Sequence, residues 1–239
     1  MAVINYITQI QFGYGSLDSL QQECERLGIK RPLVVTDKGV RAAGIVDKVI
    51  ARLGGGTPGI FDETPANPNE QAVRKATEIF RAGGHDGIIA VGGGSSIDLA
   101  KGVAVCARHD GPLASFALVE GGIGRITAAT APVIAIPTTA GTGSEVGRGA
   151  VLILDDGRKV GVISPHVVPK VAICDPELTL ALPPMLTAAP AWMPSRIALK
   201  PFLRRPSIRP PTALRWTDCG APGSILQPRR RIRPIAMPA

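Results

Sequence analysis

The first half of the chain alternates between short apolar runs and longer stretches in which apolar residues recur every three or four positions. The apolar runs predict buried strands at residues 33–35, 60–61 and 88–91. The stretches with helical spacing predict helices at residues 17–27, 46–53, 69–82 and from 97 onward. Ser16 is positioned to cap the first of these helices. This β-α-β-α-β order predicts an α/β fold with a parallel sheet covered by helices on both faces.

The second half of the chain continues mainly with strands. The predicted extended segments, with the opening segment included, lie at residues 3–13, 133–136, 150–154, 159–163 and 171–174. Asp156-Gly157 separates two of them, and an Asp-Gly pair between alternating segments predicts a β-hairpin. The stretch 112–129 is polar and contains glycine, so it predicts a loop.

A glycine turn, Gly-Gly-Gly-Ser-Ser-Ile-Asp at residues 92–98, joins a predicted strand to a predicted helix. The first backbone N–H groups of a helix are free to bind an anion, and glycine lets a phosphate come close to the backbone. Ser95 and Ser96 add hydroxyl donors. The turn therefore predicts a pyrophosphate site for a dinucleotide, and an ordinary strand-to-helix turn is the alternative.

Two further features follow predicted parallel strands, where ligands of open α/β sheets gather. Residues 137–145 form a second turn that is rich in glycine and hydroxyl groups, and Asp37 follows the strand at 33–35. A carboxylate at Asp37 suits the two ribose hydroxyls of adenosine and repels a 2′-phosphate, which favours NAD over NADP; a helix cap is the alternative. No G-x-G-x-x-G motif follows a predicted strand and opens a predicted helix, so the sequence is not that of an ordinary Rossmann dehydrogenase.

Five sequence blocks together are more specific than any one of them. They are Val35-Thr36-Asp37-Lys38, Asn67-Pro68, the run from Gly92 to Lys101, the run from Pro137 to Glu145, and Asp175-Pro176-Glu177-Leu178-Thr179. With these blocks the chain resembles the iron-containing alcohol dehydrogenases over nearly all of residues 1–189. Glycerol-type dehydrogenases and dehydroquinate-synthase-like enzymes share the fold, but the last two blocks fit the alcohol dehydrogenase branch better.

The resemblance implies a dehydroquinate-synthase-like N-terminal nucleotide-binding domain with a mostly parallel sheet and a β-hairpin, followed by an all-helical domain that holds iron or zinc. It implies that NAD lies in the cleft between them. By position, Asp37 holds the adenosine ribose, and Gly93, Gly94 and Ser95 cradle the pyrophosphate with Asp98 in the same loop. The remaining implied cofactor contacts are Thr138, Thr139, Thr142 and Ser144 on the adenine and nicotinamide side, together with Asn67 and Lys159.

Composition changes sharply near residue 189. Residues 190–239 contain ten Lys and Arg against one acid, and ten of the 22 prolines. The chain's net charge of +8 therefore resides in this tail, and residues 1–189 carry a net charge of −1. We predict an NAD-binding α/β domain at 1–186 and a disordered Pro/Arg-rich tail at 187–239. A neutral body argues against a nucleic-acid or membrane partner.

The tail departs from the family pattern. In the family, one Asp and three His of the helical domain bind the metal, and the first two follow a Leu-Thr-Ala-Ala block. Here Leu186-Thr187-Ala188-Ala189 is followed by Pro190-Ala191-Trp192-Met193-Pro194, whose codons, read in another frame, can encode Gly-Met-Asp-Ala. We interpret the tail as the product of a frameshift, so that the helical domain and its metal ligands are missing. None of the three histidines, His85, His109 and His166, lies at the expected position.

These observations predict an NAD-dependent, iron- or zinc-dependent oxidoreductase that interconverts a small alcohol and an aldehyde or ketone. This chain is expected to be truncated and inactive. The alternatives are a related oxidoreductase acting on 4-hydroxybutyrate or maleylacetate and, in another class, a non-enzymatic module that binds through its basic tail. Four scattered cysteines and the lack of a signal peptide or membrane-length apolar run predict a cytoplasmic protein. The family resemblance implies that the chain can form a homo-oligomer.

Overall fold

The computed structural model describes residues 2–5, 8–55 and 57–180. The predicted tail and the domain boundary at 186/187 lie outside these residues. The strands are β1 (Ala2–Asn5), β2 (Gln9–Phe12), β3 (Pro32–Val35), β4 (Gly59–Phe61), β5 (Gly87–Gly92), β6 (Val133–Pro137), β7 (Gly149–Ile153), β8 (Lys159–Ile163) and β9 (Val171–Cys174). The α-helices are α1 (Leu20–Arg26), α2 (Lys38–Ala42), α3 (Ile45–Ile50), α4 (Glu70–Ala82) and α5 (Gly94–Cys106).

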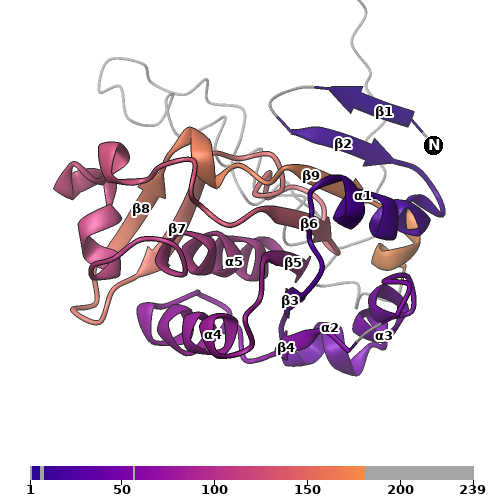
Figure 1. The fold of residues 1–239 in the computed structure, drawn as a ribbon, viewed down its shortest axis with the longest axis horizontal. Coiled ribbons are helices and arrows are strands. Elements are labelled where there is room, and N and C mark those ends of the chain that lie inside the picture. The colour runs from indigo at the N-terminus through magenta and orange to yellow at the C-terminus, as the bar shows by residue number, and fades with distance from the viewer. Residues whose placement is uncertain (1, 6–7, 56, 181–239) are drawn as a thin grey trace, which may run out of the picture. The chain divides into compact units, whose positions relative to one another are not determined.

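Seven strands form one sheet in the order β1-β2-β9-β6-β5-β3-β4 (Figure 1). All neighbouring strands are parallel except β1 and β2, which are antiparallel. The strands β7 and β8 form a separate antiparallel hairpin around Gly157, whose φ of 83° suits glycine. The predicted α/β fold, parallel sheet and hairpin are confirmed.

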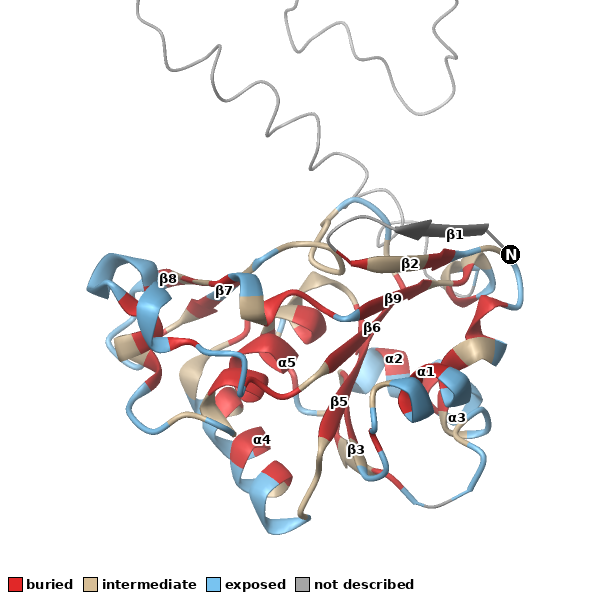
Figure 2. Cartoon of the chain, turned by 45° about the horizontal axis from the view of Figure 1, so that its top comes forward, coloured by how far each residue is buried: buried red, intermediate tan, exposed pale blue. Residues whose placement is uncertain are grey.

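Helices cover both faces of the sheet because successive strand residues point to opposite sides. On one face, Leu33, Ile88 and Val133 pack with α4, α5 and the hairpin. On the other face, the next residues along each strand, Val34, Ile89 and Ile134, pack with α1, α2 and α3. Figure 2 shows the result: the central strands and most of α5 are buried, whereas α4 has an exposed outer side.

The adjacent strands β3 and β5 send their connections to opposite faces. From β3 the chain continues through α2 and α3 to the edge strand β4, whereas from β5 it continues through α5 to β6 on the other side. Their helices belong to the two different core clusters. In open α/β sheets such a reversal leaves a crevice at the carboxyl ends of the two strands, where ligands bind. The crevice here lies between the ends of β3 and β5.

Two local predictions were wrong in detail. The segment expected as a helix from Leu17 begins with a 3₁₀ turn at Ser16–Ser19 and becomes α-helical at Leu20. Ser16 does not cap it: its hydroxyl is buried with no hydrogen-bond partner, and the Leu17 N–H donates to Asp175 Oδ2 over 3.1 Å. The start of this segment is therefore capped by Asp175, which lies 158 residues away in the sequence.

The stretch 112–129 is more ordered than a plain loop. It contains 3₁₀ turns at Leu113–Phe116, Leu118–Glu120 and Gly122–Arg125. Phe116 and Ala117 are buried in the core cluster on the α5 face, and Ala117 forms an isolated bridge with Val162 of the hairpin. This segment therefore packs against the hairpin.

Candidate cofactor site

The glycine turn lies at the end of β5 and begins α5. Gly92 has a φ of 144°, and a Cβ there would lie 2.6 Å from Ser96 Oγ, so only glycine fits. Gly93 is the N-cap residue of α5 in an extended conformation, with φ −78° and ψ −173°. The first turn of α5 contains no acidic residue. The free N–H groups at the start of this 13-residue helix therefore keep their preference for an anion.

Ser95 and Ser96 link this turn to two neighbouring segments. Ser95 Oγ donates to the carbonyl oxygen of Ala66 over 2.6 Å, which holds the 64–68 loop beside the start of α5. Ser96 Oγ lies 3.4 Å from Asp37 Oδ2, which connects α5 to the end of β3. The two strand ends at the switch point are thus joined by side chains.

Asp37 is both a helix cap and a wall of the cavity at this edge of the sheet. Its Oδ1 accepts the N–H of Val40 over 3.0 Å, so it is the N-cap of α2. Its carboxylate also lines the cavity at this edge of the sheet. The helix-cap alternative is therefore confirmed as a contact, and the predicted ribose contact stays a prediction.

The cavity has a volume of about 780 Å³ and lies over the ends of β3, β5 and β6. It is lined from α2, from the 62–66 loop and from both turns; the sequence-predicted residues among its walls are Asp37, Gly93, Ser95, Thr138 and Thr139. Cofactor sites typically occupy about 300–1,000 Å³. A smaller hollow of about 280 Å³, between α4 and the end of α5, contains none of the predicted residues.

The second turn packs directly on the first. Gly92 pairs with Pro137 across the strands, and the Thr138 N–H donates to the Gly92 carbonyl over 3.0 Å. A Cβ at Gly93 would lie 3.3 Å from Thr139 Oγ1, and one at Gly94 would lie 3.1 Å from Thr142 Cβ. The glycines thus permit close contact between the two turns. The Thr138 hydroxyl and, in the facing loop, the Thr64 hydroxyl are buried without a hydrogen-bond partner.

Thr64 is a wall residue that the sequence reasoning did not single out. Its position before Pro65 gave only a loop signal, and nothing local showed that the loop faces Asp37.

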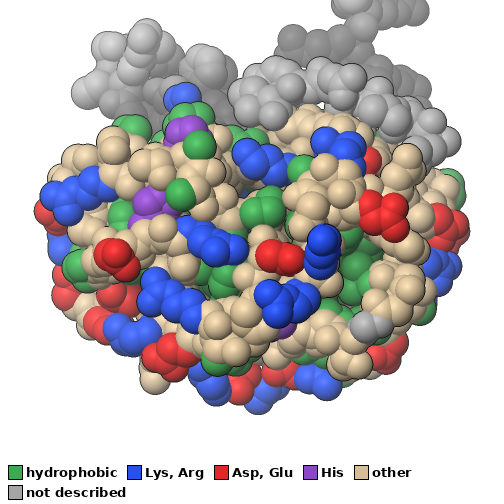
Figure 3. All heavy atoms as spheres, viewed as in Figure 1, with side chains coloured by type: hydrophobic (Ala, Val, Ile, Leu, Met, Phe, Trp, Pro, Cys, Tyr) green, Lys and Arg blue, Asp and Glu red, His purple; other side chains and the backbone are tan. Residues whose placement is uncertain are grey.

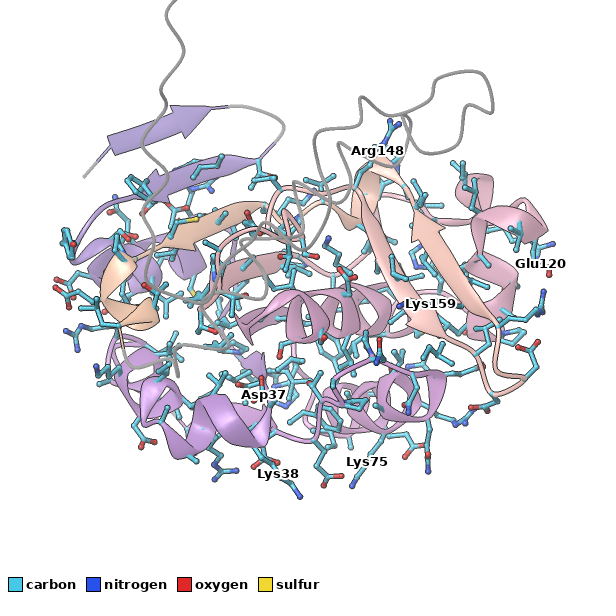
Figure 4. All side chains as sticks on the ribbon, turned by 180° about the vertical axis from the view of Figure 1, so that it is seen from behind. Asp37, Lys38, Lys75, Glu120, Arg148 and Lys159 are labelled. Carbon is cyan, nitrogen blue, oxygen red and sulfur yellow. The ribbon has the colours of Figure 1, made fainter. Side chains whose placement is uncertain are left out.

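The other six predicted residues are not among this cavity's walls: Asn67, Gly94, Asp98, Thr142, Ser144 and Lys159. Asn67 Oδ1 accepts from Lys159 Nζ over 3.5 Å, which joins the 64–68 loop to the hairpin. Figure 4 shows Asp37 at the start of α2 and Lys159 well apart from it, on the hairpin. Ser144 follows Thr142, and its N–H donates to Thr142 Oγ1 over 3.4 Å. The predicted residues therefore form a row rather than one cluster.

Asp98 and Lys101 form a buried ionic pair on α5. Asp98 Oδ1 and Lys101 Nζ are 3.7 Å apart, and the Lys101 side chain is fully buried. Burial raises the pKa of the Asp98 carboxyl, opposed mainly by the Lys101 charge and the N–H of Val151. Burial likewise lowers the pKa of Lys101, opposed by the charges of Asp98 and Glu145. Sequence reasoning assigned Asp98 to the cofactor loop and gave Lys101 no role, because a helical lysine is usually exposed.

The described part of the chain contains no cluster of three or more His, Cys, Asp and Glu side chains that could hold a metal ion. Two of its histidines make structural contacts: His85 Nδ1 lies 3.0 Å from the Arg31 carbonyl, and His109 bonds to the Val105 carbonyl and Thr127. The residues present in the described ranges do not fit a metal centre.

The surface of the described unit agrees with its neutral composition. On the face in Figure 3, Lys and Arg side chains are interspersed with Asp and Glu, without a region of one sign. No helix among the described residues has the length and hydropathy needed to cross a membrane.

Residues 8–176 match the family model described as iron-containing alcohol dehydrogenase. The chain belongs to the iron-containing alcohol dehydrogenase family. This family consists of oxidoreductases, and the resemblance inferred from the five sequence blocks is confirmed. Among relatives, a 4-hydroxybutyrate dehydrogenase from Cupriavidus necator is 55% identical over 211 residues, which are 88% of this chain and 55% of that protein. A 1,3-propanediol dehydrogenase from Citrobacter freundii is 41% identical over 183 residues, 74% of this chain and 46% of that protein.

Solved structures of the family share the fold. A 1,3-propanediol oxidoreductase superposes with a TM-score of 0.73 at 38% identity, over 80% of this chain and 49% of that one. A sulfoacetaldehyde reductase from Bifidobacterium kashiwanohense, solved in complex with NAD+, superposes with a TM-score of 0.72 at 32% identity, over 81% of this chain and 51% of that one. The chain thus spans about half the length of the family members it matches.

Proposed function

We propose that this chain binds NAD and forms the cofactor half of an alcohol dehydrogenase that interconverts a small alcohol and an aldehyde or ketone. The observation that carries the proposal is the meeting of Asp37 and the glycine turn at the switch point between β3 and β5, beside a cavity of about 780 Å³. A family member of similar fold that was solved with NAD+ supports it.

Each predicted residue has a physical task in this proposal. The N-terminal amides of α5 bind the pyrophosphate, because they offer donors at the positive end of a helix. The Ser95 hydroxyl adds a donor when its proton turns from the Ala66 carbonyl oxygen to a phosphate oxygen. Asp37 accepts hydrogen bonds from the adenosine ribose and repels a 2′-phosphate. Thr138 and Thr139 line the adenosine side, while Thr142, Ser144 and Asp98 lie farther along α5 toward the hairpin. NAD supplies hydride transfer, and the protein supplies binding and orientation.

Asn67 and Lys159 complete the row. Their contact joins the hairpin to the 64–68 loop, which Ser95 holds beside the start of α5, so both side chains lie next to the glycine turn's side of the proposed cofactor path. We assign them to orientation of the cofactor.

The substrate proposed first is a short hydroxy acid such as 4-hydroxybutyrate, because a relative of that activity is 55% identical. Maleylacetate is the less favoured alternative: a maleylacetate reductase from Agrobacterium tumefaciens superposes with a TM-score of only 0.59 at 29% identity. Catalysis in the family uses iron or zinc, and the described residues hold no ligand set for it. The proposal for this chain is therefore cofactor binding.

Isothermal titration calorimetry of the chain with NAD, NADP and AMP tests the proposal. Saturable NAD binding that is tighter than NADP binding is expected. Absence of NAD binding by folded protein, as judged by circular dichroism, would overturn it. Titration of NADH formation with 4-hydroxybutyrate, 1,3-propanediol and ethanol, each with and without Fe²⁺ or Zn²⁺, separates cofactor binding from turnover, and we expect no turnover.

A further inference from the structure

Lys101 has a location that packing alone does not explain. Its side chain is fully buried in α5, between the sheet and the hairpin. Its neighbours on α5, Ala100, Gly102 and Val103, are also buried. Burying an ammonium group is unfavourable unless it is paired and hydrogen-bonded, and an apolar side chain of the same size would avoid that penalty. A buried lysine here indicates a specific polar task.

The ammonium group of Lys101 binds the segment that leads from the second turn into the hairpin. Lys101 Nζ donates to the carbonyl oxygens of Gly147 over 2.9 Å and Gly149 over 2.8 Å. One turn earlier on the same helix face, Asp98 Oδ2 accepts the N–H of Val151 over 3.0 Å. Two side chains of α5 thus hold residues 147–151 through three backbone groups.

The segment between this attachment and the glycine turn has few other contacts, among them a hydrogen bond from the Ser144 side chain to Asp98. Within it, the Val146 N–H reaches the Gly143 carbonyl and the Gly147 N–H reaches the Ser144 carbonyl, both over 3.3 Å. These are long hydrogen bonds, and all residues from 142 to 147 are partly exposed. At its other end the segment rests on α5 through the contact of Thr142 with Gly94. Its position therefore depends on the attachments to α5 at Lys101 and Asp98.

We propose that Lys101 is a positioning residue that fixes the 142–149 segment on α5, so that Thr142 and Ser144 face the glycine turn. The inference rests on the proposed NAD site for its functional meaning. Lys101 does not touch the 780 Å³ cavity around Asp37. It acts on the part of the row that lies beyond the adenosine side.

The test uses the full chain and the substitution Lys101→Met, which keeps the apolar stem and removes the donors. Lys48→Met is the matched control, because Lys48 is exposed on α3 and is not among the residues that line the cavity. Hydrogen exchange followed by mass spectrometry reports on the amides of 142–149, and calorimetry reports on NAD and AMP. AMP occupies only the adenosine side and should not depend on this segment.

For Lys101→Met we expect about tenfold faster exchange in 142–149, with exchange of β5 and β6 unchanged. We expect NAD affinity to fall about tenfold, the value of one hydrogen bond, with AMP affinity unchanged. Lys48→Met should match wild type in all measurements. Unchanged exchange in 142–149, or equal losses for NAD and AMP, would overturn the proposal.

A second substitution covers the case in which Lys101→Met does not fold. Gly147→Ala disturbs the segment itself without changing Lys101, because a Cβ there would lie 3.1 Å from the Gly143 carbonyl oxygen and 3.9 Å from Lys101 Nζ. It should reproduce the selective loss of NAD affinity, and wild-type NAD affinity in this variant would count against the proposal. If wild-type chain binds no NAD, the proposed function fails, and the exchange measurement alone decides whether Lys101 holds the segment.

Discussion

Replacing Gly93 with alanine separates cofactor binding from folding. The backbone of Gly93, at φ −78° and ψ −173°, is accessible to alanine, so the substitution introduces no strain. An alanine N-cap is less favourable than glycine, but the unfolded chain also loses freedom, and the two effects offset each other to within about 1 kcal/mol. The added Cβ lies 3.3 Å from Thr139 Oγ1, a distance that a small shift relieves.

Binding should respond far more strongly than stability. Gly93 lines the cavity, so the added methyl group occupies space at the point where the proposed pyrophosphate meets the start of α5. Loss of one charge-assisted hydrogen bond there is worth about 1.5–3 kcal/mol, which corresponds to a loss of NAD affinity of about 10- to 100-fold. Calorimetric titration with NAD measures the affinity, and urea unfolding followed by circular dichroism measures the stability.

Substitutions at two other glycines serve as comparisons for Gly93→Ala. Gly124→Ala is the matched control, because nothing lies within 4 Å of its Cβ and it lies in an exposed 3₁₀ turn. Gly92→Ala should instead destabilise the protein by about 3 kcal/mol or more, since it combines a φ of 144° with a 2.6 Å collision against Ser96. Wild-type NAD affinity in Gly93→Ala would refute the assignment of the glycine turn as a pyrophosphate site.

The remaining predictions concern charge and the hairpin. Asp37→Asn should keep the α2 cap and the protein's stability but reduce the preference for NAD over NADP. Asp37→Ala should reduce the same preference and also lower the free energy of unfolding by about 1 kcal/mol, because the cap is lost. Equal selectivity in both variants and wild type would argue against the ribose contact. Lys159→Met should weaken NAD binding. Its free energy of unfolding should stay within about 0.5 kcal/mol of wild type, because the contact of Lys159 with Asn67 is exposed. Unchanged NAD affinity in calorimetry would show that Lys159 is not part of the site. Burial raises the pKa of the Cys106 thiol from 9.0 to about 12, so the folded state holds its proton longer. The stabilisation of the folded state that comes from this raised pKa is fully present below pH 9 and is lost as the pH rises toward 12. The loss in the free energy of unfolding amounts to about 2 kcal/mol between pH 8 and 10.5. Urea unfolding of Cys106→Ala should show a correspondingly flatter pH dependence, and an unchanged slope would contradict this.

Sequence reasoning succeeded where the signal is local. The apolar runs at 33–35 and 88–91 and the Asp-Gly pair at 156–157 appear in the structure as β3, β5 and the hairpin turn. The glycine turn and Asp37 also lie where parallel strand ends place them, because the strand order brings β3 beside β5. The short helix α2 was missed, since five residues carry too little periodicity to be seen.

The features that escaped prediction are long-range. Ser16 looked like a cap, but the Leu17 amide is bound by Asp175, 158 residues away. Lys101 was given no role from the sequence, and only the packing of β7 on α5 shows that its side chain is enclosed. The apolar residues on both sides of Lys101 were the one available hint that this helix is buried all round.

The insertion of β9 between β2 and β6 has a consequence for synthesis on the ribosome. The chain makes β2 at residues 9–12, but its parallel neighbour β9 ends 162 residues later, at Cys174. At about 5–20 residues per second, this interval lasts about 10–30 s. During that time the β1–β2 pair has no place in the sheet, and the 3₁₀ turn at Ser16–Ser19 lacks the Asp175 carboxylate. The first strands to be synthesised are therefore among the last to be incorporated, and a nascent chain arrested before residue 171 leaves them as free edges open to other chains.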